Sequence, residues 1–237
     1  MKGSIIGDMI GSVYRLNNTL DYNFPILSEK STFTVCTLST VAIMDALINN
    51  HSYDRSLHDW CNKYSDYSYQ TINGINPLVC ISPISLLDIS PQVAFYNTRL
   101  ILLCYHSNST EQIYATIYVL ILRRLRLFHK KEVALETMRD GIGKLWREFL
   151  PEKGKFSDTV NVTLPLAVHL FIKSQSFEDA IRLAVSYGGD SASLATIVGG
   201  LAESYYGISE RLWNEVKFML PKDMLGIIDK IYSLKGE

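Results

Sequence analysis

Residues 176–207, SFEDAIRLAVSYGGDSASLATIVGGLAESYYG, predict two helices joined by a glycine pair. In the first half, apolar side chains recur at the spacing of one buried helical face, at Phe177, Ala180, Ile181, Ala184 and Val185. Ser176 is the expected N-cap of this helix, and Gly188-Gly189 ends it. Asp190 can cap the next helix, which we expect to run from about Ser191 to Tyr206. One side of that second helix allows close approach of a neighbour because it carries the small residues Ala195, Gly199 and Ala202.

The other periodic segments of the chain are also helical, and none shows the alternation typical of a strand. Helices are expected at residues 38–48, at 113–127 behind a capping box at Ser109–Gln112, and at 210–220 and 222–234 on either side of Pro221. Residues 64–91 contain Gly74 and three prolines, Pro77, Pro83 and Pro91, and predict a long loop. The sequence therefore predicts an all-α protein, a compact orthogonal helical bundle with residues 1–237 in a single domain.

Composition excludes several classes of protein. Hydrophobic residues make up 47% of the 237 residues, which excludes a disordered chain. The net charge of −1 argues against nucleic-acid binding and against a polybasic membrane anchor. The longest apolar run, Ile113–Leu122, is too short to span a bilayer. The four cysteines show neither zinc spacing nor a disulfide framework. We expect a cytoplasmic protein with no nucleic-acid or membrane partner.

Three segments carry a resemblance to a known family. They are GSIIGDMIGS at residues 3–12, STFTVCTLSTVAIMDALI at residues 31–48, and the stretch at residues 176–210 that contains the helix pair described above. Together they resemble the ADP-ribosylglycohydrolase family over nearly the whole chain, most specifically in the last segment. The resemblance implies an all-α bundle of the ADP-ribosylglycohydrolase type. It also implies an activity that removes ADP-ribose from modified side chains or related O-linked compounds, generally with two magnesium ions.

The resemblance further implies where metal ligands should stand. The family's Thr-Asp-Asp positions and its later Asp-x-Asp-Ser/Thr positions fall on Thr34, Val35, Cys36, Asp190, Ala192 and Ser193. Valine, cysteine and alanine thus replace three of the four carboxylates. Two Mg²⁺ ions would bring a charge of +4 against −1 from Asp190, and Mg²⁺ requires oxygen ligands. We expect no cofactor, and at most weak residual Mg²⁺ binding at a vestigial site made by Thr34, Asp190 and Ser193.

Looser matches imply further ligand-binding residues. The family's early glutamate falls on Arg15, and weaker motif matches occur at Asn73-Gly74 with Ser82-Pro83 and at His106. The expected ligand-binding set is therefore Asn73, Gly74, His106, Arg15 and Gly189. Each residue type also has a plain structural interpretation: Arg15 as a solvated arginine, His106 as a hydrogen-bonded histidine, and Asp8 and Asp190 as helix caps. Arg123, Arg124 and Arg126 are interpreted as a solvated helix end.

Three functions follow from these residues. The first is a pseudoenzyme that has lost the two-magnesium site and acts by binding ADP-ribose, an ADP-ribosylated protein, or an ADP-ribosyltransferase toxin as an immunity protein would. The alternative is an active but weak or single-metal hydrolase that removes ADP-ribose from modified proteins. The third is a different enzyme with Cys36 as nucleophile and His106 as its candidate base. The loss of carboxylates within an intact helical frame favours the first, so we expect an inactive protein.

Overall fold

Helices α9 (Phe177–Tyr187) and α10 (Ser191–Tyr206) confirm the predicted helix pair. The structure, a computed structural model, describes residues 1–64, 76–144, 146, 150–155 and 159–234. Ser176 Oγ accepts a hydrogen bond from the amide of Asp179 at 3.1 Å, as an N-cap does. Gly188 and Gly189 have φ values of +82° and +77°, a conformation that glycine adopts without strain. The two glycines therefore turn the chain between the helices, as the sequence predicts.

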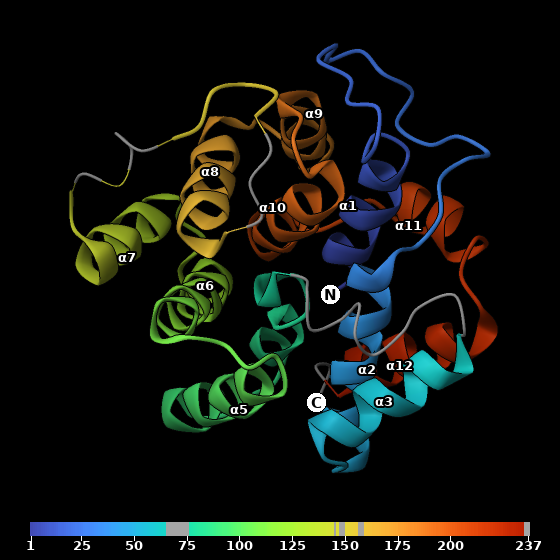
Figure 1. Ribbon diagram of the computed structural model, residues 1–237, viewed down its shortest axis with the longest axis vertical. Helices are drawn as coiled ribbons and strands as arrows, with labels where there is room; N and C mark the ends of the chain where they lie inside the picture. Colours follow the sequence, from blue (N-terminus) through green and yellow to red (C-terminus); the bar gives the residue numbers. More distant parts are fainter. Residues whose placement is uncertain (65–75, 145, 147–149, 156–158, 235–237) are drawn as a thin grey trace.

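Helix α1 (Lys2–Ser12) lies directly against α10 in the middle of the molecule (Figure 1). Its glycines recur every four residues, at Gly3, Gly7 and Gly11, and so share one face of the helix. A Cβ on Gly7 would lie 2.0 Å from the carbonyl oxygen of Ala195, and one on Gly199 of α10 would lie 2.1 Å from the carbonyl oxygen of Gly3. The two backbones are therefore in contact. This contact sets the relative position of every residue that α1 and α10 carry.

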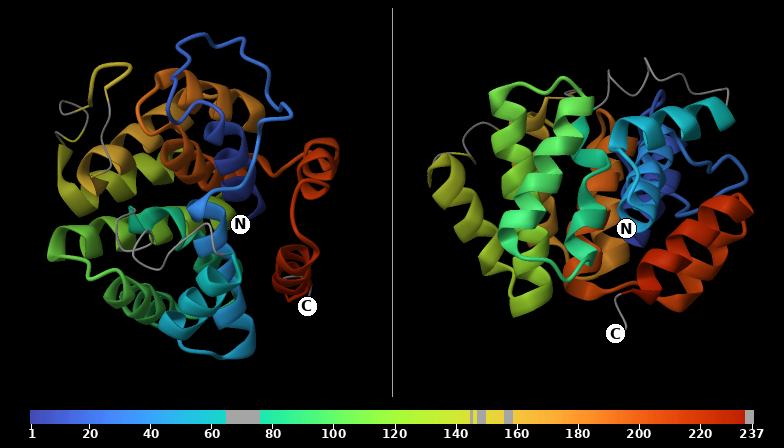
Figure 2. Two further views of the ribbon diagram at one scale, coloured as in Figure 1. Left: turned by 45° about the vertical axis from the view of Figure 1, so that its right-hand side comes forward. Right: turned by 90° about the horizontal axis from the view of Figure 1, so that it is seen from below.

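Helix α2 (Val35–Asn49) is the buried central helix that the sequence predicts. Most of its side chains are buried, including Leu38, Val41, Ala42 and Ile43, which have no exposed surface. Helices α3 (Tyr53–Lys63) and α12 (Lys222–Ser233) cover it, and α11 (Glu210–Lys217) leads from α10 to α12. Figure 2 shows α11 and α12 on one flank of the molecule. The predicted helices on either side of Pro221 are thus confirmed.

Four further helices pack on the other side of α10 (Figures 1 and 2). They are α5 (Pro91–Cys104), α6 (Ser109–Phe128), α7 (Glu132–Ile142) and α8 (Val160–Lys173). Buried Tyr118 of α6 donates a hydrogen bond to the carbonyl of Ile197 in α10 at 3.0 Å. The residues described contain no strand, which confirms the all-α prediction. In the same part of the chain, no helix combines the length and the apolar character needed to cross a bilayer.

Both ends of α6 differ from the sequence prediction. The N-cap is Asn108 instead of Ser109: Asn108 Oδ1 accepts from the amide of Glu111 at 3.0 Å, and Glu111 Oε2 accepts from the amide of Asn108 at 2.8 Å. The capping box therefore exists one residue earlier. At the other end, Arg123, Arg124 and Arg126 are half-buried, whereas the sequence predicted a solvated helix end. Arg123 donates to a backbone carbonyl in the segment before α5, Arg124 binds the middle of α7, and Arg126 reaches Glu203 of α10.

The prediction of a long loop at residues 64–91 is wrong for the second half of that segment. Two 3-10 turns, η1 (Pro77–Val79) and η2 (Ser82–Leu86), occupy it, and all their residues are buried. The prolines that suggested a loop stand at the starts of these turns, where a missing N–H costs nothing. The apolar side chains of these two turns pack against α2, α6 and α10. Residues 65–75 of the predicted loop lie outside the described residues.

Candidate functional site

Asp8 of α1 binds the first turn of α2. The carboxylate is fully buried and accepts four hydrogen bonds: Oδ1 from Thr34 Oγ1 at 2.6 Å, and Oδ2 from the amides of Thr34 and Thr37 at 2.8 and 3.1 Å and from Thr37 Oγ1 at 2.6 Å. Burial raises the pKa of Asp8, and the four hydrogen bonds oppose that rise. Asp8 is thus a cap, as the structural interpretation predicts, but it caps α2 and not its own helix.

The N-terminal ends of α2 and α10 meet beside this cap. Asp190 Oδ1 accepts from the amide of Ser193 at 3.3 Å, and its Oδ2 accepts from Ser193 Oγ at 2.6 Å. Ser193 Oγ in turn lies 3.9 Å from Cys36 Sγ at the start of α2. Thr34 Oγ1 accepts from the amide of Cys36 at 3.1 Å. The structure therefore brings together the two separate sequence segments on which the resemblance places metal-ligand positions.

Asn18, which sequence reasoning missed, joins the loop after α1 to the turn before α10. Its Oδ1 accepts from the amide of Gly189 at 2.7 Å, and its Nδ2 donates to the carbonyl of Gly189 at 2.9 Å and to that of Tyr14 at 2.8 Å. Both polar backbone groups of Gly189 are therefore engaged. Gly189, predicted as a ligand-binding residue, has its amide occupied by this side chain. No local pattern around Asn18 signals the contact, because its partner lies 171 residues away.

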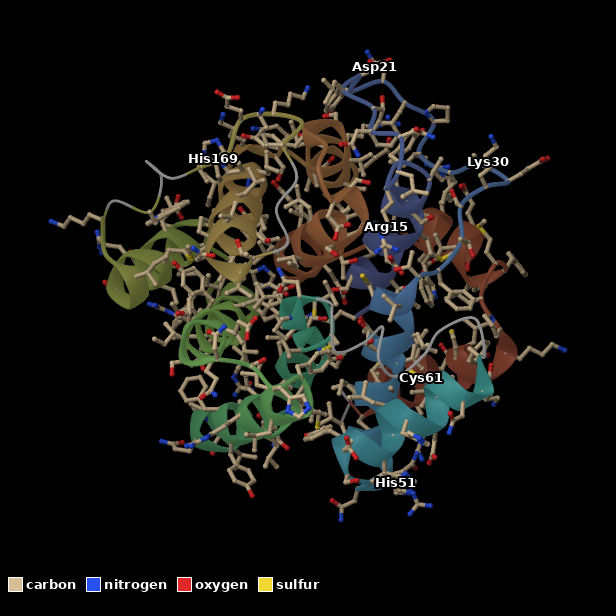
Figure 3. All side chains as sticks on the ribbon, in the orientation of Figure 1. Arg15, Asp21, Lys30, His51, Cys61 and His169 are labelled. Atoms are coloured by element: carbon tan, nitrogen blue, oxygen red, sulfur yellow. The ribbon has the colours of Figure 1, made fainter. Side chains whose placement is uncertain are left out.

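Of the other predicted ligand-binding residues, Arg15 and His106 do not join this cluster. Arg15 is exposed, and within the described ranges it forms no ion pair; Figure 3 shows it over the front of α1, below the loop that carries Asp21 and Lys30. His106 is exposed in a left-handed conformation at the end of α5, where its amide donates to the carbonyl of Leu103 at 3.1 Å. Asn73 and Gly74 lie outside the described residues.

The environment of Cys36 opposes a nucleophilic role. The thiol is buried, and burial together with the nearby carboxylate of Asp8 raises the pKa of Cys36 far above its ordinary value. The thiolate required for attack is therefore scarce at neutral pH. Its neighbours in the described structure are Thr34, Ser193 and the two aspartates, and His106 is not among them. These observations favour the interpretation of Cys36 as a small buried side chain.

The residues at the junction of α2 and α10 do not fit a pair of Mg²⁺ ions. Val35 and Ala192 have no side-chain oxygen, and Cys36 offers a thiol that Mg²⁺ disfavours. The carboxylate oxygens of Asp8 each already accept at least one hydrogen bond from Thr34 or Thr37, and those of Asp190 accept from Ser193. Within the described part of the chain, no three His, Cys, Asp or Glu side chains are grouped as metal ligands.

Replacing Asp8 by alanine is expected to destabilise the protein by about 3 kcal/mol or more, because two buried amides and two hydroxyls of Thr34 and Thr37 lose their acceptor. Asp8→Asn should cost less, since its carbonyl oxygen can still serve the two amides. Urea unfolding followed by circular dichroism measures both, with Asp229→Ala on the exposed face of α12 as the control. Equal stability of Asp8→Ala and Asp229→Ala would show that the four hydrogen bonds do not stabilise α2.

Comparison with known proteins supports the resemblance seen in the sequence. A family model described as ADP-ribosylglycohydrolase matches residues 1–236. Among solved structures, one titled "ADP-ribosylglycohydrolase-related protein complex" is similar with a TM-score of 0.78 and 19% sequence identity, covering 98% of this chain and 95% of that chain. At this identity the structural likeness shows the fold alone. A search of the curated proteins finds no match.

Proposed function

The chain belongs to the ADP-ribosylglycohydrolase family, and from this premise we propose that it is a member that binds an ADP-ribosyl group without hydrolysing it. The family's metal ligands are the groups that hydrolysis requires, and this chain replaces three of them. The family's characteristic ligand contains a diphosphate and two riboses, so binding it does not require the metal-activated water. ADP-ribose itself or an ADP-ribosylated protein is the proposed partner.

The observation that carries the proposal is the chemistry of the α2–α10 junction. Val35, Cys36 and Ala192 are buried there, with 3%, 3% and 1% of their surface exposed. Val35 and Ala192 are apolar and Cys36 carries a thiol, so these three side chains supply no oxygen ligand to two divalent cations. The remaining acid at these positions, Asp190, caps α10 and accepts from Ser193. Both contacts are those of a structural cap.

The intact frame supports a retained role. The glycine face of α1 still contacts α10, and Asp8 still caps α2, so the two helix ends that form the junction remain in place. Loss of function without a new use would remove selection on such costly features, including a fully buried carboxylate. The losses are instead confined to the ligand positions. This pattern supports a binding protein over a chain that has lost its role altogether.

Calorimetry and a hydrolysis assay test the proposal together. We expect ADP-ribose to bind the protein with an affinity that Mg²⁺ does not change, and ADP-ribosylated arginine, serine and O-acetyl substrates to release ADP-ribose at the rate of buffer alone. The variant Asp190→Asn should behave as the parent, since asparagine is an equally good N-cap. Asp229→Asn on α12 is the matched control.

Two outcomes would overturn the proposal. Release of ADP-ribose that EDTA abolishes, and that Asp190→Asn but not Asp229→Asn removes, would establish the weak or single-metal hydrolase instead. The second outcome is that ADP-ribose does not bind while the purified protein inhibits an ADP-ribosyltransferase. The partner would then be that enzyme and not an ADP-ribosyl group. In that case the protein would act as an immunity protein.

A further inference from the structure

A cleft of about 380 Å³ lies between the second half of α6, the start of α5 and the end of η2. This volume is within the usual range for sites that bind small molecules. Its walls combine two kinds of side chain. The apolar part consists of Leu87, Pro91, Leu120 and Leu127, and the polar part contains the three arginines Arg123, Arg124 and Arg126. Arginines beside an apolar wall are suited to a ligand that is both anionic and apolar.

Arg123 brings a positive charge into the cleft. Its Nη1 donates to the carbonyl of Leu87 at 3.3 Å, and its Nη2 donates to the carbonyl of Ile89. These bonds orient the guanidinium but leave its charge uncompensated. Among the described residues it forms no ion pair, although Asp88 lies between the two carbonyls in sequence and is exposed. A guanidinium has five N–H donors, so donors remain for a ligand.

The other two arginines are paired, and one of them retains a free donor. Arg124 Nη2 lies 3.6 Å from Glu136 Oε2, and Arg126 Nη2 lies 3.6 Å from Glu203 Oε1. Arg126 has only 15% of its side chain exposed, and its Nε is buried without a hydrogen-bond partner. A buried orphan donor is rare in folded proteins and indicates a missing acceptor. Three arginines against two glutamates leave the lining of the cleft with a net positive charge.

We propose that this cleft binds an amphipathic anion, a carboxylate or phosphate head group joined to an apolar chain. The head group pairs with Arg123, and the chain lies along the leucines toward Leu127, which is 73% exposed at the mouth of the cleft. The cleft is separate from the α2–α10 junction. Glu203, which pairs with Arg126, stands 13 residues after Asp190 on α10, or about 20 Å along the helix axis.

Titration of the full chain with octanoate and octyl phosphate tests the proposal, with octanol and octylamine as neutral and cationic probes of similar length. Isothermal titration calorimetry should show saturable binding of the anions only, and the tighter of the two anions identifies the head group. The variant Leu127→Asp places a like charge at the mouth and should weaken anion binding about tenfold. Leu103→Asp is the matched control, because Leu103 is also exposed, at 58%, but lies on α5 outside the cleft.

Both variants alter exposed residues, so the fold should survive in each. Arg123→Lys adds a third measurement: the charge stays while the planar fork is lost, and octanoate should bind more weakly than to the parent. Equal binding of octanol and octanoate would overturn the proposal, since the arginines would then contribute nothing. Absence of saturable binding by either anion, or equal weakening by Leu127→Asp and Leu103→Asp, would also overturn it.

Discussion

Replacing Gly7 by alanine is expected to cause a large loss of stability, because the contact between α1 and α10 leaves no room for a methyl group. The new Cβ would lie 2.0 Å from the Ala195 carbonyl oxygen and 2.5 Å from its carbon, both backbone atoms that cannot rotate away. An ordinary contact requires about 3.4 Å, so α1 and α10 would have to separate by more than an ångström. We expect a cost of at least about 3 kcal/mol, from overpacking and the lost helix contact.

Thermal unfolding followed by circular dichroism measures this cost. For a chain of this length, about 3 kcal/mol corresponds to a fall in Tm of roughly 6–12 °C. Gly226→Ala is the matched control: Gly226 is exposed within α12, and a Cβ there meets no atom within 4 Å. That variant should instead gain about 0.5–1 kcal/mol, because alanine favours the helix. A Gly7→Ala variant with the Tm of the parent would contradict the close α1–α10 contact.

Restoring the missing carboxylates is expected to make stability depend on Mg²⁺. The triple variant Val35→Asp, Cys36→Asp and Ala192→Asp returns three acids to buried positions around Asp8 and Asp190. Without metal it should lose several kcal/mol, because crowded buried like charges repel and are poorly solvated. With Mg²⁺ the loss should be partly reversed, since an ion that binds only the folded state stabilises it by about 2.7 kcal/mol at a hundredfold excess over its Kd.

The measurement is the Tm of parent and variant, each with and without Mg²⁺. The triple variant Val35→Asn, Cys36→Asn and Ala192→Asn is the control, because it adds side chains of similar size without charge. If the triple aspartate variant fails to fold, the single variant Ala192→Asp can be measured in its place, with a smaller expected rise in Tm on adding Mg²⁺. A rise in Tm confined to the aspartate variants supports a vestigial two-metal site. Equal responses of parent and variants would show that the ligand positions were carried over wrongly from the family.

Local sequence patterns predicted most of the secondary structure but not all of its ends. The helix pair at 176–207 followed from apolar spacing, a serine cap and two glycines, all of which act within a few residues. The predicted N-cap of α6 is one residue off because both Asn108 and Ser109 are good caps. The choice depends on which of them exchanges hydrogen bonds with Glu111, and in the structure it is Asn108. Local sequence predicts a loop at η1 and η2 because the order of these turns comes from burial between α2, α6 and α10.

The sequence by itself determined the helical frame and the family, and it places Val35, Cys36 and Ala192 where the family resemblance implies carboxylates, since each depends on residue types and short spacings. Only the tertiary structure decided which groups meet. It placed Asp8 under Thr34 and Thr37, joined Asn18 to Gly189, buried Arg126, and left Arg15 and His106 exposed. These contacts join residues up to 171 positions apart, and they exist because two glycine-lined helices approach until their backbones touch. The periodicity of one chain segment cannot predict the distance between α1 and α10, because that distance depends on how both helices pack.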